Sequence, residues 1–378
     1  MRFLLPVCAF AVVAVAQDVH PAEITVADSA RKYRFLAKSA RDKKQYAEAA
    51  GYYESYLRYV PDDARVQYRL GEMYFRTDRP VEATAALTRA VALDSLQINA
   101  NILLYNLHLA AGRADSAAVC LERLLVAKPD DMDKRRMLAD LYRREGRLRE
   151  AIKHYEVLAD QAAEAEGLIE LVAVLYEDLG DGELALEWRR RLVADGDTAL
   201  QDDKRLQTLE TMVRLQLETG DVHSAYQTLL QLAETDTSNR YSYYSRIATL
   251  AEGKGDTQML LRGWTGMVQA NPLDLDTTAR LVERYLNRER MEQARRLIDE
   301  GLRIEPEDGH LQLLRGDMLA MQDDEEGALA AFAVAMRDPR WQEVAQQRIW
   351  EIRPPETEEE KLRKAFFGKQ VGSDSTSN

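Results

Sequence analysis

Cysteine is nearly absent from this chain. The sequence contains two, Cys8 and Cys120, and Cys8 lies in an N-terminal apolar run that we expect to be removed. With a single cysteine left, the chain can form neither an internal disulfide nor a cysteine-based zinc site. Because Cys120 stands among apolar residues such as Val119 and Leu121, we expect a buried and chemically inert thiol.

Long hydrophobic runs are also scarce. One extends from Phe3 to Val15, follows Arg2, and is closed by Ala14-Val15-Ala16. This is the pattern of a secretory signal peptide with a small-x-small cleavage site. The run is shorter than the roughly 18 apolar residues of a membrane-spanning helix, and no later segment approaches that length. We therefore expect a leader over residues 1–16, cleaved after Ala16, and a mature chain without a transmembrane segment that is exported to the periplasm or another extracytoplasmic space. A lipid anchor on the leader cysteine and an uncleaved anchor helix are less favoured alternatives.

Positive charge is in deficit. The chain has 51 lysines and arginines against 64 aspartates and glutamates, a formal net charge of −13. Loss of Arg2 with the leader makes the mature chain one charge more acidic. Such a balance argues against nucleic acid as a partner and against an anionic membrane surface, although a local basic patch can persist within it.

Motifs that carry chemistry are missing as well. The five histidines are scattered and form no His-Glu-x-x-His pair. Gly253-Lys254-Gly255 lacks the rest of a phosphate-binding loop, and no Gly-x-Ser-x-Gly segment is present. The many carboxylate pairs are typical of solvated helix faces in an acidic protein. We expect no enzymatic activity, no metal and no cofactor.

A period of 34 residues dominates what is present. Alanine marks it at Ala49, Ala83, Ala117, Ala151, Ala185, Ala225, Ala294 and Ala328, and Leu260 takes the place of the marker in one copy. Four residues later stands a large side chain: Tyr53, Leu87, Leu121, Tyr155, Leu229, Trp264, Ile298 and Phe332, with Arg189 as the exception. Thirteen residues before the marker lie Leu36, Leu70, Leu104, Leu138, Val172, Met212, Ile247 and Leu281, with Arg315 as the exception. The residue after these is small in most copies. Small residues let two antiparallel helices approach, and large ones fill the space between hairpins.

Turn residues fit the same frame. Glycine recurs five residues before the marker, at Gly112, Gly146, Gly180, Gly220 and Gly255. Proline recurs twelve residues after it, at Pro61, Pro129, Pro272 and Pro306. Glycine ends a helix and permits reversal of the chain, and proline cannot continue one. Each period is therefore predicted to be a helical hairpin.

This pattern resembles the tetratricopeptide repeat family, whose signature is leucine, glycine and tyrosine on a first helix and alanine, phenylalanine and proline on a second. We place nine copies, beginning at residues 30, 64, 98, 132, 166, 206, 241, 275 and 309. The resemblance implies an all-α, right-handed solenoid superhelix over residues 30–340. Around it we expect a linker at 17–29, a capping helix at 341–353 and a disordered tail at 354–378. The extra residues near 195–205 form either a hinge or, as we favour, a longer loop.

In this family the first helices line a concave groove, so residues two, five, nine and twelve of each copy are candidates to face it. Eleven of them, which we call the N-terminal groove residues, form a mainly basic and polar set in copies one to four: Arg31, Arg34, Lys38, Arg41, Arg65, Tyr68, Phe75, Asn99, Asn106, Arg136 and Arg143. Later copies turn acidic or neutral there, with Glu170, Glu177, Glu210, Glu252, Asp276, Glu283 and Asp317. The set could bind an acidic segment of a protein or peptide partner, with the two asparagines hydrogen-bonding its backbone. Alternatively, the basic face only balances nearby acids such as Asp42. The family's carboxylate-clamp specificity is not transferred, because Ile102 stands where a lysine is expected.

Taken together, these patterns indicate a non-catalytic scaffold or adaptor of the cell envelope that binds a partner in its groove. A periplasmic chaperone that holds exported clients is the alternative, and an enzyme acting on cell-wall polymers is the least favoured. Neither the identity of the partner nor the oligomeric state follows from the sequence.

Overall fold

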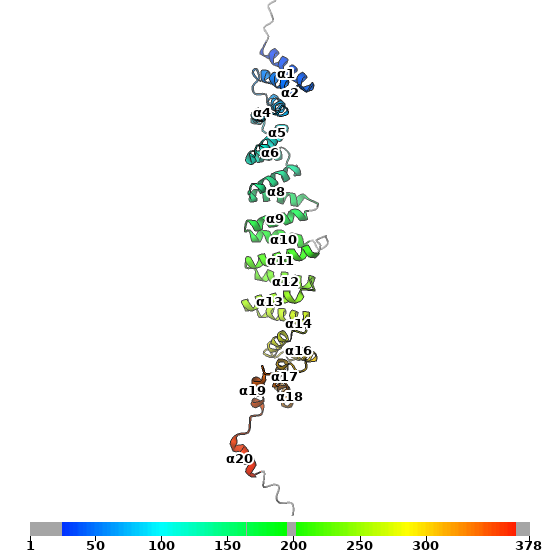
Figure 1. The fold of residues 1–378 in the computed structure, drawn as a ribbon, viewed down its shortest axis with the longest axis vertical. Helices are drawn as coiled ribbons and strands as arrows, with labels where there is room; N and C mark the ends of the chain where they lie inside the picture. Colours follow the sequence, from blue (N-terminus) through cyan, green and yellow to red (C-terminus); the bar gives the residue numbers. More distant parts are fainter. Residues whose placement is uncertain (1–24, 164, 195–201, 368–378) are drawn as a thin grey trace, which may run out of the picture. The chain divides into compact units, whose positions relative to one another are not determined.

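The computed structural model describes residues 25–163, 165–194 and 202–367. These residues form α-helices joined by short turns, and no strand occurs among them, so the all-α prediction is confirmed. The fold divides into two compact units, residues 1–175 and residues 176–378. In each unit the helices follow one another in chain order (Figure 1).

Eighteen of the helices form nine hairpins. The first helices are α1 (Val26–Asp42), α3 (Ala64–Arg76), α5 (Ile98–Ala110), α7 (Met132–Arg144), α9 (Glu166–Asp178), α11 (Asp202–Glu218), α13 (Arg240–Lys254), α15 (Leu275–Leu286) and α17 (Gly309–Ala320). The second helices are α2 (Tyr46–Leu57), α4 (Pro80–Leu93), α6 (Ala114–Ala127), α8 (Leu148–Gln161), α10 (Gly182–Ala194), α12 (Val222–Thr235), α14 (Thr257–Ala270), α16 (Met291–Ile304) and α18 (Glu325–Ala335). Two more helices, α19 (Gln342–Ile352) and α20 (Glu358–Phe367), follow the last hairpin.

Two first helices start earlier than the repeat frame predicts. Helix α1 extends back to Val26 because the Thr25 side chain accepts a hydrogen bond from the Asp28 amide and caps it. Helix α11 begins at Asp202 rather than at residue 206, which assigns part of the extra segment to helix. The remainder, 195–201, lies outside the described residues, as do the leader and most of the predicted linker.

Small and large residues of one hairpin are in contact, as the period suggests. A Cβ atom added at Gly71 would lie 2.5 Å from Leu87 Cγ, and one added at Gly316 would lie 2.3 Å from Phe332 Cε1. Leu87 and Phe332 are fully or almost fully buried. Close approach of the two helices therefore depends on the missing side chain at these positions.

The turn inside each hairpin has a left-handed residue at the same position in every copy. Five copies use glycine, with φ between 68° and 81°. The other four use Lys44, Asp78, Glu289 and Asp323, with φ between 54° and 62°. The sequence pattern identified the glycines but not the four equivalent residues, because the shape of the turn is set by helix packing.

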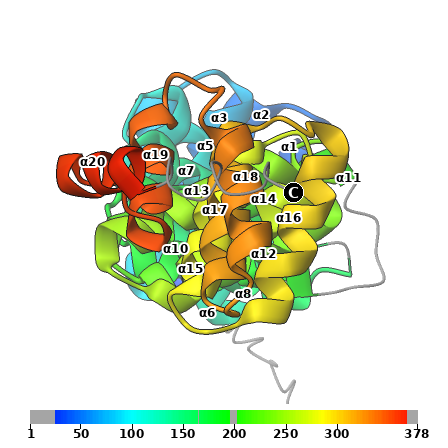
Figure 2. The same ribbon diagram turned by 90° about the horizontal axis from the view of Figure 1, so that it is seen from below.

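Helix α19 covers the open end of the last hairpin, where the capping helix was expected. It lies beside the α17–α18 hairpin (Figure 2), and Ala345 joins the buried cluster that contains Phe332 and Ala335. Trp341 and Ile349 pack against the same cluster.

Helix α20 lies within residues 354–378, for which the sequence predicts a mostly disordered tail. The Thr357 side chain accepts a hydrogen bond from the Glu360 amide, and Glu360 in turn accepts one from the Thr357 amide, 3.0 Å away. This reciprocal pair is a capping box that starts a helix without help from packing. Residues 368–378 lie outside the described residues.

Candidate functional site

The N-terminal groove residues all lie on first helices of the N-terminal unit, namely α1, α3, α5 and α7. Nine of the eleven are exposed, and Arg41 and Tyr68 are partly buried. The structure therefore leaves the whole set accessible to a partner. Whether the set binds one stays a prediction.

Five of these basic side chains form no ion pair with any described residue: Arg34, Lys38, Arg65, Arg136 and Arg143. A sixth, Arg31, is 4.0 Å from Asp28 with both side chains largely exposed. Exposed pairs of that kind contribute little free energy. Most of the positive charge on this face is thus not neutralised within the described chain.

Arg41 instead fits the alternative interpretation, in which a basic side chain of this face balances a nearby acid. Its guanidinium binds Asp42 at 2.8 Å, and this hydrogen bond raises the pKa of Arg41. The Tyr53 hydroxyl and Glu72 also lie within its electrostatic reach. Arg41 therefore balances a neighbouring acid, and the available positive charge lies on the other residues of the set.

Apolar and amide groups lie among the charges. Phe75 is 41% exposed and adds an apolar side chain to the accessible set. The Arg69 guanidinium lies over the Tyr68 ring, with its Cζ atom 5.1 Å from the ring centroid. Asn99 and Asn106 are exposed on α5, with their amides free to meet a peptide backbone.

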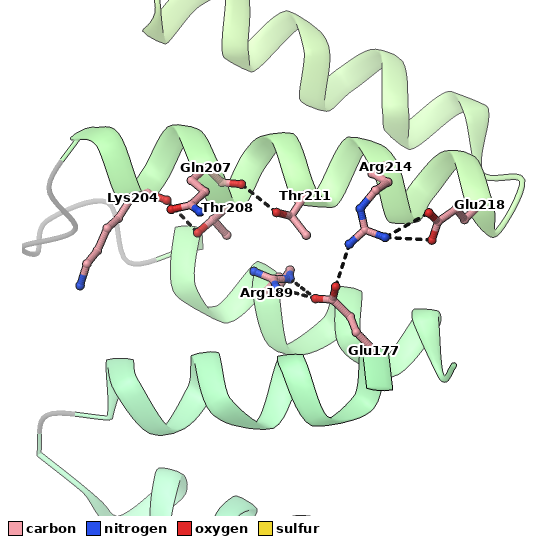
Figure 3. A network of polar contacts seen from close by, with 8 residues as sticks. All are labelled: Glu177, Arg189, Lys204, Gln207, Thr208, Thr211, Arg214 and Glu218. Atoms are coloured by element: carbon pink, nitrogen blue, oxygen red, sulfur yellow. Dashed lines mark hydrogen bonds and ion pairs between the residues drawn. The ribbon is translucent and has the colours of Figure 1, made fainter. Parts of the chain in front are cut away.

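In the C-terminal unit four of the groove acids have basic partners within the described chain. The Glu177 carboxylate on α9 accepts a hydrogen bond from Arg189 Nε at 2.7 Å and another from Arg214 at 2.8 Å (Figure 3). Arg214 also binds Glu218 at 3.0 Å. Arg189 is only 8% exposed, and it occupies the place that other copies give to a large apolar residue. The exception in the repeat pattern is therefore a buried ion pair that ties α10 to α9 and, through Glu177, to α11.

Three more acids of this unit have basic partners. Glu210 binds Arg246 at 2.8 Å, and Glu283 lies 3.0 Å from His310 Nε2. Asp317 binds Arg348 of the capping helix at 3.0 Å. The sequence located these acids, but it could not identify their partners, because the partners come from different positions of neighbouring helices.

Other chemistry is limited in the described residues. Cys120 is 2% exposed, and burial raises the pKa of its thiol to about 11, so a reactive thiolate is disfavoured. No cluster of three metal-ligating side chains occurs in this part of the chain. None of its helices has both the length and the apolar character needed to cross a bilayer.

One further feature escaped the sequence pattern. A cleft of about 740 Å³ lies between α14 and the turn that joins α15 to α16, and three arginines line it. First helices contribute Tyr244 and Tyr285 to its lining, and neither residue is at a predicted groove position.

Comparison with known proteins supports the repeat assignment. A family model described as "Tetratricopeptide repeat" matches residues 36–97, 103–166 and 280–340. No curated protein matches the chain. Among solved structures, MamA from Desulfovibrio magneticus RS-1 is 18% identical over 46% of this chain and 100% of its own, with a TM-score of 0.32. A tetratricopeptide repeat protein from Parabacteroides merdae is 20% identical over 68% of this chain and 98% of its own, with a TM-score of 0.28.

These likenesses concern the fold only, and the assignment depends on the family model and on the hairpins themselves. Three stretches match the model, and the helices between them continue the same hairpin pattern with the same left-handed turn position. The chain therefore contains tetratricopeptide repeats at residues 36–97, 103–166 and 280–340, within an α-solenoid of helical hairpins.

Proposed function

We propose that this chain is an exported, non-catalytic scaffold or adaptor of the cell envelope, which holds an acidic segment of a partner protein on its N-terminal groove residues. The observation that carries the proposal is the set of exposed basic side chains without ion-pair partners in the described N-terminal unit, in a protein whose net charge is −13. Charge-assisted hydrogen bonds from arginine to carboxylate are strong and directional. The exposed Phe75 supplies an apolar contact beside them.

Charge reversal tests the binding face. The combined variant Arg34→Glu, Lys38→Glu and Arg65→Glu should weaken partner binding by about a hundredfold, because attraction becomes repulsion at three positions. The matched control Lys43→Glu, Lys44→Glu and Arg58→Glu changes charge by the same amount at exposed positions of the same unit outside the groove set. Equal binding by the two variants would exclude this face.

Crosslinking in the native host, followed by recovery of the protein, supplies the partner for that measurement. One or two stoichiometric proteins support a scaffold, whereas a broad set of exported clients would favour the chaperone alternative. The same preparation tests export. A chain recovered from the envelope should start at Gln17, and a chain that retains Met1 would contradict cleavage after Ala16.

A further inference from the structure

Two hairpins of the N-terminal unit share a polar contact between adjacent copies. The Tyr142 hydroxyl donates a hydrogen bond of 2.5 Å to Glu122, and Arg147 stacks on the tyrosine ring at 4.4 Å. Arg147 also binds Asp115 at 3.1 Å and Glu150 at 2.9 Å. A tyrosine, an arginine and carboxylates thus close the junction between two hairpins.

The same contact recurs one pair of copies earlier. The Tyr74 hydroxyl donates to Glu54, Arg79 lies 4.5 Å from the Tyr74 ring, and Arg79 binds Glu82 at 2.8 Å. Tyrosine and glutamate are 20 residues apart in both cases. The repetition shows that the junction accommodates a glutamate carboxylate against the tyrosine hydroxyl.

A third junction has the tyrosine and the arginine but not the acids. Tyr285 and Arg290 of copy eight occupy the positions of Tyr142 and Arg147. Thr265 stands where the glutamate would be, 20 residues before the tyrosine. Likewise, Gln258 replaces the aspartate and Gln293 replaces the second glutamate. Every carboxylate of the junction has been exchanged for a neutral side chain.

The cleft of about 740 Å³ opens at this place. Its lining contains Thr265, Gln258, Tyr285 and Arg290 together with Arg262 and Arg288, and no acidic side chain. None of the three arginines has an ion-pair partner among the described residues. Three exposed arginines around a cleft whose lining holds no acid favour the binding of an external anion.

We propose that this cleft binds a glutamate or aspartate side chain of a partner protein, seated where Glu54 and Glu122 lie in the other two junctions. Tyr285 donates its hydroxyl to the incoming carboxylate, and Arg290 and its neighbours supply charge-assisted hydrogen bonds. The cleft is lined by residues of α13, α14 and α15 and of the turn after α15, all in the C-terminal unit, so the proposal does not depend on the groove face of the N-terminal unit.

The test uses the full chain carrying Arg34→Glu, Lys38→Glu and Arg65→Glu, so that binding at the N-terminal groove is removed. The probe is a fluorescein-labelled peptide of alternating glutamate and glycine, and a glutamine version serves as the neutral control. Fluorescence anisotropy should show binding of the acidic peptide alone. Arg262→Gln with Arg290→Gln should weaken it by at least about tenfold, because two charge-assisted contacts are lost.

Restoring the missing acid gives a second and opposite readout. Thr265→Glu places a carboxylate at the spacing found in the other junctions, so it should occupy the cleft, abolish peptide binding and raise Tm by about 2 °C. Thr249→Glu, at an exposed site of the same unit, is the matched control and should do none of these. Peptide binding that survives both the double arginine variant and Thr265→Glu would overturn the proposal.

Three other results would also overturn it. One is that the acidic peptide does not bind at all, which would mean that the cleft takes no carboxylate. Another is displacement of the peptide by inorganic phosphate at an equal concentration, which would assign the cleft to a free anion. Concentration-dependent self-association that Thr265→Glu abolishes would assign it to an acid of a second copy of this chain. If the unaltered protein binds the peptide and the groove variant does not, the first of these results is obtained, and it assigns the peptide to the N-terminal groove residues.

Discussion

Backbone conformation at single residues separates the nine turns into two groups. In five turns glycine takes the left-handed conformation without steric cost, whereas four turns force it on side chains with a Cβ. Glu289 is one of these, with φ of 56° and an exposed side chain. The packed helices on either side hold its backbone in the left-handed conformation, and the Cβ of Glu289 makes that conformation sterically strained.

Replacing Glu289 with glycine should therefore stabilise the protein by about 0.5–1 kcal/mol, because the left-handed strain is relieved. Urea denaturation measures the change in the free energy of unfolding. Glu289→Ala keeps a Cβ and should leave stability almost unchanged. Gly146→Ala, at the equivalent turn, should destabilise the protein by about 1 kcal/mol. A stabilising alanine at Gly146 would contradict this account of the turn.

The ionised carboxylate of Asp274, which caps the N-terminus of α15, also contributes to stability. The Asp274 carboxylate accepts hydrogen bonds from the Thr277 amide at 3.0 Å and from the Tyr241 hydroxyl at 2.7 Å. Burial disfavours the ionised form, but these hydrogen bonds outweigh it, and the pKa of Asp274 lies below its usual value. Stability from this group is therefore complete above the unfolded-state pKa of about 3.9 and is lost as pH falls through the lower pKa of the folded state.

Asp274→Ala should accordingly destabilise the protein by about 1 kcal/mol at pH 7, the usual cost of a lost N-cap, and by less at about pH 3. Asp274→Asn keeps a capping oxygen but cannot titrate, so its stability relative to wild type should improve as the pH falls. Denaturation at the two pH values measures both differences. A cost of Asp274→Ala that is independent of pH would show that charge plays no part.

At the scale of elements, the junctions between hairpins combine packing with polar contacts. Burial, reinforced by the hydrogen bond to Glu122, raises the pKa of Tyr142 to about 12, which fits a hydroxyl that remains protonated and donates. The Tyr142 and Tyr285 junctions share the tyrosine and the arginine and differ at the positions of the acids. This gives a direct comparison of a closed junction with an open one.

Tyr142→Phe should cost about 1–2 kcal/mol of stability, because Glu122 loses its donor at a partly buried site. Tyr285→Phe should cost little in the unliganded protein, since no described carboxylate accepts from that hydroxyl. Thermal or urea unfolding of the two variants makes the comparison. Equal losses would mean that the ring, and not the hydroxyl, stabilises the junction.

Much of the element level could be predicted because the 34-residue period fixes which residue lies on which side of each helix. Two departures could not. Arg189 breaks the apolar pattern, and only the neighbouring helices reveal that Glu177 and Arg214 complete its environment. Arg315 breaks it in the last copy, where the side chain is exposed and no apolar residue is needed. Helix α20 begins at a capping box in a stretch whose composition favours disorder, so composition and the local hydrogen bonds point in different directions there.

For the whole molecule, a repeat array must close its ends, since each hairpin is stabilised by its neighbours. At the C-terminal end α19 performs this role over Phe332 and Ala335. No equivalent burial is found for α20, whose described side chains are exposed.

A chain that ends at residue 340 should therefore lose about 3 kcal/mol of stability, from the exposure of one or two large apolar side chains, and bind more of a hydrophobic dye. A chain that ends at residue 353 keeps α19 and should match the full protein in Tm. Differential scanning calorimetry together with dye fluorescence compares the two. Equal Tm values for both truncations would show that α19 does not act as a cap.

The sequence alone determined the repeat, its hairpin architecture, the position of most turns and the acidic balance of charge, because each follows from spacing and composition. Tertiary structure decided which charges remain available. Arg41 is satisfied by Asp42 and Glu177 by two arginines, whereas Arg34, Arg65 and the three arginines of the cleft have no described ion-pair partner. The physical reason is that an ion pair requires atoms within about 4 Å, and the pairs between helices join residues up to 37 positions apart, which a period of 34 does not specify.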